Sequence, residues 1–222
     1  MNATELSALL VLATATSFTP GPNTTLSTAL AANGGLARAL HFVCAVPVGW
    51  GLLFALCAAG LGALVVAQPL LRWAVLMGGV AYLLWLAQRL WRSRSLNQVD
   101  KAQLTVTFWQ GVGLQFVNIK AWMLALSLVA GWVAGRPDAW LRFAQVLPLM
   151  LAFAFLSNFT YALIGSVLRQ WLAGPWVDGV ATGERLSVFN RVMALALVLT
   201  AGWMLVSGMN MNINMGNQGA TP

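Results

Sequence analysis

The sequence contains little charge and very few acidic residues. Only 8% of its 222 residues are Asp, Glu, Lys or Arg, and the acidic residues number five. A soluble domain has about a quarter charged residues, because a surface in contact with water needs them. The composition therefore excludes a water-soluble globular domain, and the hydrophobic content of 59% indicates a chain that lies mostly in lipid.

Residues that carry out catalysis or bind metals are equally scarce. There is one histidine, and the two cysteines, Cys44 and Cys57, are 13 residues apart in one predicted helix. They would lie roughly 20 Å apart along that helix, too far for a disulfide. The sequence also lacks paired carboxylates, a Gly-x-Ser turn, a metal-ligand cluster and a phosphate-binding loop. We predict no catalytic residues, no metal site and no cofactor.

Apolar runs of about 20 residues, the length that crosses roughly 30 Å of hydrocarbon, are abundant. We predict an all-α membrane protein with six transmembrane helices in a single polytopic domain, residues 1–209. The expected spans are Leu6–Ala32, Leu40–Ala67, Leu70–Leu90, Phe108–Val133, Phe143–Leu168 and Val188–Met209. Residues 210–222 have no charge and no apolar periodicity, which predicts a disordered tail.

The net charge of +7 comes mostly from basic residues in short loops beside the apolar runs. One set of alternate loops carries Arg38, Arg89, Arg92, Arg94, Lys101, Arg169, Arg185 and Arg191, and the other carries Arg72, Arg136 and Arg142. Because Lys and Arg concentrate in cytoplasmic loops, the first set is predicted to be cytoplasmic and both termini to lie on the opposite side. This arrangement reflects topology in a lipid bilayer, so we predict no nucleic-acid partner.

The six spans divide three plus three around a basic connection, giving halves of about residues 1–90 and 108–209. Because three is an odd number, the second half enters the membrane from the opposite side, and the halves would be inverted repeats. Pro20 and Asn118 are 98 residues apart, and Pro47 and Pro148 are 101 residues apart, which supports a repeat. Matched interruptions in two such halves are typical of the substrate site of a secondary transporter.

The first span is interrupted by the run Thr19-Pro20-Gly21-Pro22-Asn23. Each proline removes a backbone N–H, so about one turn of helix should unwind. Unwound backbone at membrane depth is tolerated where it is buried in protein or faces water. Free carbonyls can bind an ammonium group and the next helix N-terminus a carboxylate, which predicts a site for a zwitterion. The alternative is a structural kink whose hydroxyl groups bond to their own helix.

The fourth span carries Asn118 and Lys120 near its middle, and no acidic residue lies inside any span to pair with the lysine. A charge at this depth costs about 2.5–3.5 kcal/mol on insertion scales. Lys120 is expected to contact a substrate carboxylate, directly or through water, or to gain and lose a proton. The alternative is a structural lysine that donates to orphan carbonyls at the Pro-Gly-Pro break, and the two roles are compatible.

Two other polar positions give a weaker signal. Asn158 shares a helix face with Tyr161 in the fifth span, and these residues line the same cavity or make interhelical hydrogen bonds. His41 lies near the cytoplasmic start of the second span, as a pH-sensing group or as a tolerated interfacial residue. The predicted substrate-binding residues are Thr19, Pro20, Gly21, Pro22, Asn23, Asn118, Lys120 and Asn158.

Four motifs together resemble a known family. They are Thr19-Pro20-Gly21-Pro22-Asn23, then Asn33-Gly34-Gly35 with Arg38, then the stretch Gly78–Leu83, and finally Phe108-x-x-Gly111 with Asn118-x-Lys120-Ala121. The chain resembles the LysE/RhtB family of amino-acid exporters over almost its whole length apart from the tail. The resemblance implies a multi-pass protein of the bacterial inner membrane that exports amino acids or similar small solutes, using the proton-motive force. The oligomeric state is open, with a homo-oligomer as one option.

The chain departs from the family pattern at two positions. Members often have Asp where this chain has Asn23, which removes a candidate proton-binding carboxylate, and Pro where it has Ile119, which predicts a less broken fourth span. The alternatives are a membrane thiol-redox protein, a cation exporter and a non-transporting scaffold. Thr19 in place of a cysteine at the break argues against the first, and the lack of buried carboxylates argues against the second. The same lack favours neutral substrates over cationic ones.

Overall fold

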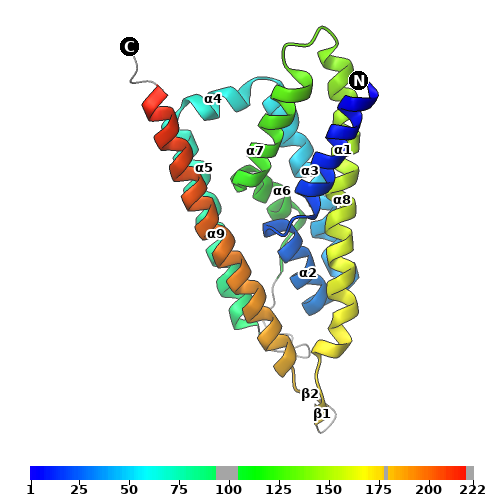
Figure 1. Ribbon diagram of the computed structural model, residues 1–222. Coiled ribbons are helices and arrows are strands. Elements are labelled where there is room, and N and C mark those ends of the chain that lie inside the picture. Colours follow the sequence, from blue (N-terminus) through cyan, green and yellow to red (C-terminus); the bar gives the residue numbers. More distant parts are fainter. Residues whose placement is uncertain (94–104, 178–179, 219–222) are drawn as a thin grey trace.

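The computed structural model describes residues 1–93, 105–177 and 180–218 of the chain, and nearly all of this part is helical (Figure 1). The helices are α1 (Ala3–Phe18), α2 (Pro22–Gly34), α3 (Leu36–Ala58), α4 (Leu61–Ala67), α5 (Pro69–Arg92), α6 (Phe108–Val117), α7 (Ile119–Leu128), α8 (Ala139–Leu172) and α9 (Glu184–Gln218). A π-helical turn, Val129–Val133, continues α7. The strands in the described part, β1 (Trp176–Val177) and β2 (Val180–Ala181), form a two-residue antiparallel ladder.

Four of the helices, α3, α5, α8 and α9, are long and apolar enough to cross a membrane. The pair α6–α7, with its π-helical turn, passes the same test as one span bent by 68°. Helix α1 is apolar but has 16 residues, fewer than the roughly 20 that a full crossing needs. The chain is therefore a multi-pass helical membrane protein. Figure 1 shows the N-terminus and the end of α9 at one end of the bundle and the β1–β2 ladder at the other.

The predicted second span, Leu40–Ala67, is wrong as a continuous helix. Helix α3 ends at Ala58, and Gly60 adopts a φ of +93°, which ends the helix and turns the chain into the short helix α4. Glycine has no Cβ, so it reaches this left-handed conformation without steric cost. In this region, the helix that is long and apolar enough to cross a membrane is Leu36–Ala58.

The C-terminal helix also differs from the expectation. Helix α9 continues to Gln218, whereas a disordered tail was expected from residue 210, and residues 219–222 lie outside the described part. The segment after Met209 contains no proline before Pro222. Proline is the residue that ends a helix most strongly, so the backbone can continue as a helix through this polar segment.

The helices pack in two groups, one of α2, α3, α6 and α8 and the other of α5 and α9. Helix α2 packs along α8, α3 packs on α6 and α8, and α5 runs beside α9, as Figure 1 also shows. The largest buried cluster joins these groups and includes Leu26, Phe42, Leu83 and Leu197, all fully or almost fully buried. The start of α2 and the break at Asn118 are buried in this packing, whereas Phe18, Thr19 and Pro20 at the end of α1 are exposed.

A buried polar cluster ties together the end of α2, the residue after α5 and the start of α9. The amides of Asn33 and Asn190 exchange hydrogen bonds of 2.7 and 2.9 Å. Ser93 Oγ donates to Asn33 Oδ1 at 3.2 Å, and Asn190 Nδ2 donates to the Ser93 carbonyl at 3.1 Å. Asn190 is fully buried, so its hydrogen bonds replace water that it cannot reach.

Replacing Asn190 by alanine is expected to destabilise the protein by about 1–3 kcal/mol, because buried partners lose their hydrogen bonds. Thermal unfolding in detergent, followed by circular dichroism, measures the effect. Thr160→Ala is the control, since the exposed Thr160 hydroxyl donates to the Leu156 carbonyl of its own helix. Equal melting temperatures for the two variants would show that the cluster contributes nothing to stability.

Candidate functional site

The chain between α1 and α2 leaves the helical path at Thr19–Gly21, because α1 ends at Phe18 and α2 begins at Pro22. In a continuous helix, the residues at positions 20 and 22 would donate to the carbonyls of Thr16 and Phe18, but proline has no N–H. The Phe18 carbonyl instead accepts from the Tyr161 hydroxyl of α8 at 3.0 Å. One of the freed carbonyls is therefore satisfied by a neighbouring helix.

The Thr24 side chain closes the first turn of α2, and backbone N–H groups of this turn remain free to donate. Thr24 Oγ1 accepts from the Gly21 N–H at 2.9 Å and donates back to the Gly21 carbonyl at 3.1 Å. Among the described residues, no acceptor is found for the backbone N–H groups of Asn23 and Thr24. Free N–H groups at a helix start favour negative charge, so this turn can hold an anionic group.

The second break is the single residue Asn118, between α6 and α7. Asn118 is buried, and its side-chain oxygen accepts from the Lys120 N–H at 3.1 Å, which caps the start of α7. On the other side of the break, Trp122 Nε1 donates to the Phe116 carbonyl at 2.7 Å. Side chains near the break thus replace part of the hydrogen bonding that a straight helix would have supplied, and the bend of 68° needs no proline.

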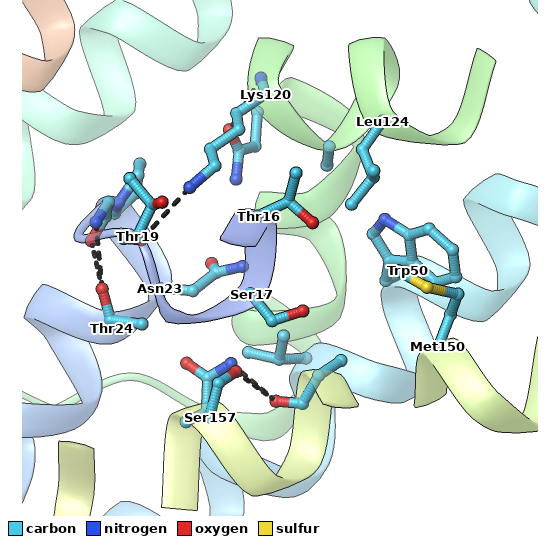
Figure 2. Close-up of a pocket in the computed structure, with 17 residues that line it drawn as sticks. Thr16, Ser17, Thr19, Asn23, Thr24, Trp50, Lys120, Leu124, Met150 and Ser157 are labelled. Carbon is cyan, nitrogen blue, oxygen red and sulfur yellow. Dashed lines mark hydrogen bonds between the residues drawn. The ribbon is translucent and has the colours of Figure 1, made fainter. Parts of the chain in front are cut away.

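Lys120, two residues after the second break, makes a direct hydrogen bond to the first break. Its Nζ donates to the Thr19 carbonyl at 3.2 Å, and Figure 2 shows the side chain extended from α7 toward the Thr19 segment. The salt bridges found in the described part of the chain involve Glu5, Arg136, Asp138 and Arg142, near the start of α8, and not Lys120. A neutral carbonyl therefore contacts the Lys120 ammonium, and the positive charge is available to an anionic ligand.

Amide side chains fix the helices around the breaks. Asn23 and Gln115 exchange hydrogen bonds of 2.9 and 3.2 Å between α2 and α6. Asn158 accepts from Ser27 Oγ at 2.9 Å and donates to the Ala154 carbonyl at 2.8 Å. Because these amides are already paired within the protein, they position the two breaks relative to α6 and α8.

Two cavities meet at the breaks. The first, which we call the α8-side cavity, has a volume of about 70 Å³ and lies between the breaks and helices α3 and α8 (Figure 2). The second, the α9-side cavity, has a volume of about 470 Å³ and extends from the breaks to Leu199, Thr200, Trp203 and Met204 of α9. Residues of both breaks line both cavities; these are Thr19, Gly21, Pro22, Asn118 and Lys120.

The structure brings the residues of the predicted site together. Seven of them line the α8-side cavity, namely Thr19, Gly21, Pro22, Asn23, Asn118, Lys120 and Asn158, and Pro20 lines the α9-side cavity. The sequence reasoning missed Trp50 of α3 and Met150 of α8, which complete the α8-side cavity. The available signal for Trp50 was its position in mid-span, away from the membrane interfaces where tryptophan is enriched. Neither Cys44 nor Cys57 lines these cavities.

A family model and individual relatives both match this chain, and both describe transport proteins. A family model described as LysE type translocator matches residues 14–207. A cysteine/O-acetylserine efflux protein of Klebsiella pneumoniae subsp. pneumoniae is 32% identical over 174 residues, which cover 77% of this chain and 86% of the relative. Proteins of the same description from Escherichia coli O9:H4 (strain HS) and Escherichia coli (strain K12) are each 28% identical over 205 residues, covering 90% of this chain and 97% of the relative. No solved structure matches the chain. Because the family model spans most of the sequence, this chain belongs to the LysE type translocator family.

Proposed function

We propose that this protein exports small neutral amino acids across the bacterial inner membrane by alternating access, driven by the proton-motive force. The observation that carries the proposal is the contact between Lys120 Nζ and the Thr19 carbonyl, at 3.2 Å. It joins two interruptions of membrane helices at a point where two cavities meet. Irregular backbone at membrane depth is tolerated where it lines a cavity, and transporters bind substrates at such breaks.

An inverted repeat with six spans is part of this proposal. We take α1 and α2 as one broken span and α6 and α7 as its counterpart in the second half. Under this correspondence, α1 matches α6, α2 matches α7 and α3 matches α8. The packing supports it: α2 packs on α8 as α7 packs on α3, and α1 packs on α8 as α6 packs on α3. The pairs α3–α8 and α5–α9 would then each be related by the same pseudo-two-fold axis. Two such halves can rock against each other around a fixed site.

The break offers complementary groups for both ends of an amino acid. The free N–H groups of Asn23 and Thr24 and the Lys120 ammonium would bind the carboxylate. The substrate ammonium would bind carbonyls near the end of α1, where Pro20 removes the donor to the Thr16 carbonyl. The α9-side cavity, at 470 Å³, lies within the range of about 300–1,000 Å³ that is typical of small-molecule sites.

The lining of the two cavities favours neutral substrates. No Asp or Glu is among the residues that line them, so the side chain of lysine or arginine would lose its hydration without gaining a counter-charge. The bacterial relatives are described as cysteine/O-acetylserine efflux proteins, and both of those compounds are small neutral amino acids. We infer the same substrate class for this chain.

Lys120 is also the group that we propose for coupling to protons. It is the one titratable side chain among the residues that line the two cavities. Asn23 occupies the position where an acidic residue would otherwise offer a second protonation site. A change in the protonation state of Lys120 would change its hold on the substrate carboxylate, which links proton binding to substrate binding.

Transport by purified protein in liposomes tests the proposed function. Labelled O-acetyl-L-serine, L-cysteine and L-lysine are loaded outside, and uptake is measured with and without an imposed pH gradient. We expect saturable uptake of the two neutral compounds, stimulated by the gradient, and no uptake of lysine above that of protein-free liposomes. Uptake of lysine alone would contradict the neutral substrate class, and uptake of none of the three would contradict export of these amino acids.

A further inference from the structure

The indole N–H of Trp50 is a buried donor without a partner. Trp50 lies in the middle of α3, three residues after Pro47, and its side chain is 5% exposed. Among the residues that the structure describes, none accepts a hydrogen bond from Trp50 Nε1. A buried donor left unpaired costs about 1–3 kcal/mol, and most buried polar groups in proteins are paired. The indole N–H therefore requires an explanation.

The environment of Trp50 holds the ring in one orientation. The indole stacks on Phe54, with ring centroids 5.2 Å apart and planes at 11°, and Phe54 stacks in turn on Phe143 at 5.3 Å. Trp50 lines the α8-side cavity, and Figure 2 shows its nitrogen edge on the side where Thr16 lies. The stack covers one face of the ring, and the nitrogen edge lies on the cavity side in Figure 2.

The rest of the α8-side cavity has the character of a pocket for a short side chain. Its volume of about 70 Å³ is too small for a whole amino acid, and it adjoins the larger α9-side cavity at the breaks. Leu124 and Met150 supply apolar walls, and Ser17 supplies a hydroxyl group. No charged side chain other than Lys120 is among its lining residues.

We propose that the α8-side cavity is the side-chain pocket of the exporter and that Trp50 is its specificity-determining residue. Its indole N–H donates a hydrogen bond to an acceptor atom on the substrate side chain, such as a carbonyl or hydroxyl oxygen. The pocket then selects short, neutral side chains that carry an acceptor over aliphatic side chains of equal length. This inference rests on the proposed function, because it assumes that the amino-acid head group binds at the breaks. A site built to hydrogen-bond its substrate rejects analogues that lack the polar group.

Competition in liposomes tests the inference with two probes of equal chain length. O-acetyl-L-serine has a side-chain carbonyl, and L-norleucine has none. Each is used unlabelled to inhibit uptake of labelled O-acetyl-L-serine by wild type, by Trp50→Phe and by the control Trp109→Phe, whose ring is 75% exposed. In wild type and the control we expect O-acetyl-L-serine to inhibit about tenfold better than norleucine. In Trp50→Phe, which keeps an aromatic ring for the stack, this preference should fall to about one.

The outcomes separate this inference from the proposed function. Transport with an unchanged preference in Trp50→Phe would overturn the role of Trp50 and leave the exporter intact. Absence of transport in wild type would overturn both. Should Trp50→Phe fail to fold, nuclear magnetic resonance of wild-type protein with ¹⁵N-labelled tryptophan gives the answer. The Trp50 indole signal, assigned by elimination after substitution of the ten other tryptophans in turn, should move when O-acetyl-L-serine is added, and an unmoved signal would contradict the proposal.

Discussion

Lys120→Ala is expected to abolish export while the protein remains inserted and folded. The substitution removes the positive charge available to the substrate carboxylate and the hydrogen bond from Nζ to the Thr19 carbonyl. A hydrogen bond to a charged group is worth about 1.5–3 kcal/mol, which corresponds to a loss of roughly 10- to 150-fold in affinity for that contact alone. Uptake of labelled O-acetyl-L-serine into liposomes measures the effect, and size-exclusion chromatography checks folding.

Lys120→Gln separates the substrate role of the lysine from its structural role. Glutamine can still donate to the Thr19 carbonyl, but it has no charge. If Lys120 binds the substrate carboxylate, Lys120→Gln should be nearly as inactive as Lys120→Ala. Transport at the wild-type rate by Lys120→Gln would instead assign the lysine to the support of the unwound segment.

Gly165→Val is expected to destabilise the protein strongly. Gly165 of α8 faces the backbone of α2 so closely that an added Cβ would lie 2.2 Å from the Thr28 carbonyl oxygen. Backbone cannot move aside as a flexible side chain can, so α2 would have to separate from α8. Overpacking typically costs about 1–3 kcal/mol, and we expect a loss at or above the upper end of this range.

The control for this variant is Gly202→Val in α9, since a Cβ at Gly202 would meet nothing within 4 Å. Both substitutions place a β-branched residue in a membrane helix, so their difference reports the close approach of α2 and α8. Heat stability in detergent, measured as the fraction that stays monodisperse, provides the comparison. Equal heat stability of the two variants would mean that the two helices are not packed in this way.

The helices that the sequence predicts well are those whose ends are set by local chemistry. Single prolines are accommodated inside α3 and α8, at Pro47 and Pro148, whereas two prolines that flank a glycine coincide with the interruption at Thr19–Gly21. Three residues, Thr19–Gly21, lie outside helix between α1 and α2, and the single residue Asn118 lies between α6 and α7.

Features set by tertiary contacts were not predictable. Gly60 ends α3, yet nothing distinguishes it in sequence from Gly62, which lies within the next helix. The role of Lys120 at the Thr19 carbonyl appeared among the alternatives, but the pairing of Asn23 with Gln115 depends on how α2 meets α6. Trp50 lines the cavity because α3 turns that face toward the breaks, and a single apolar span gives no sign of which face is turned inward.

Protection of a cysteine in the α8-side cavity tests the central claim most directly, that the exported amino acid binds at the breaks. Ser17, which lines this cavity, is replaced by cysteine in a background where Cys44 and Cys57 are alanine. The rate of reaction with a small thiol reagent is measured with increasing O-acetyl-L-serine, and Thr4→Cys, at the exposed start of α1, is the control. We predict that O-acetyl-L-serine slows the reaction of Ser17→Cys, with the same half-saturating concentration as transport, and leaves Thr4→Cys unaffected. A variant that transports O-acetyl-L-serine but reacts equally fast with and without it would contradict this location for the site.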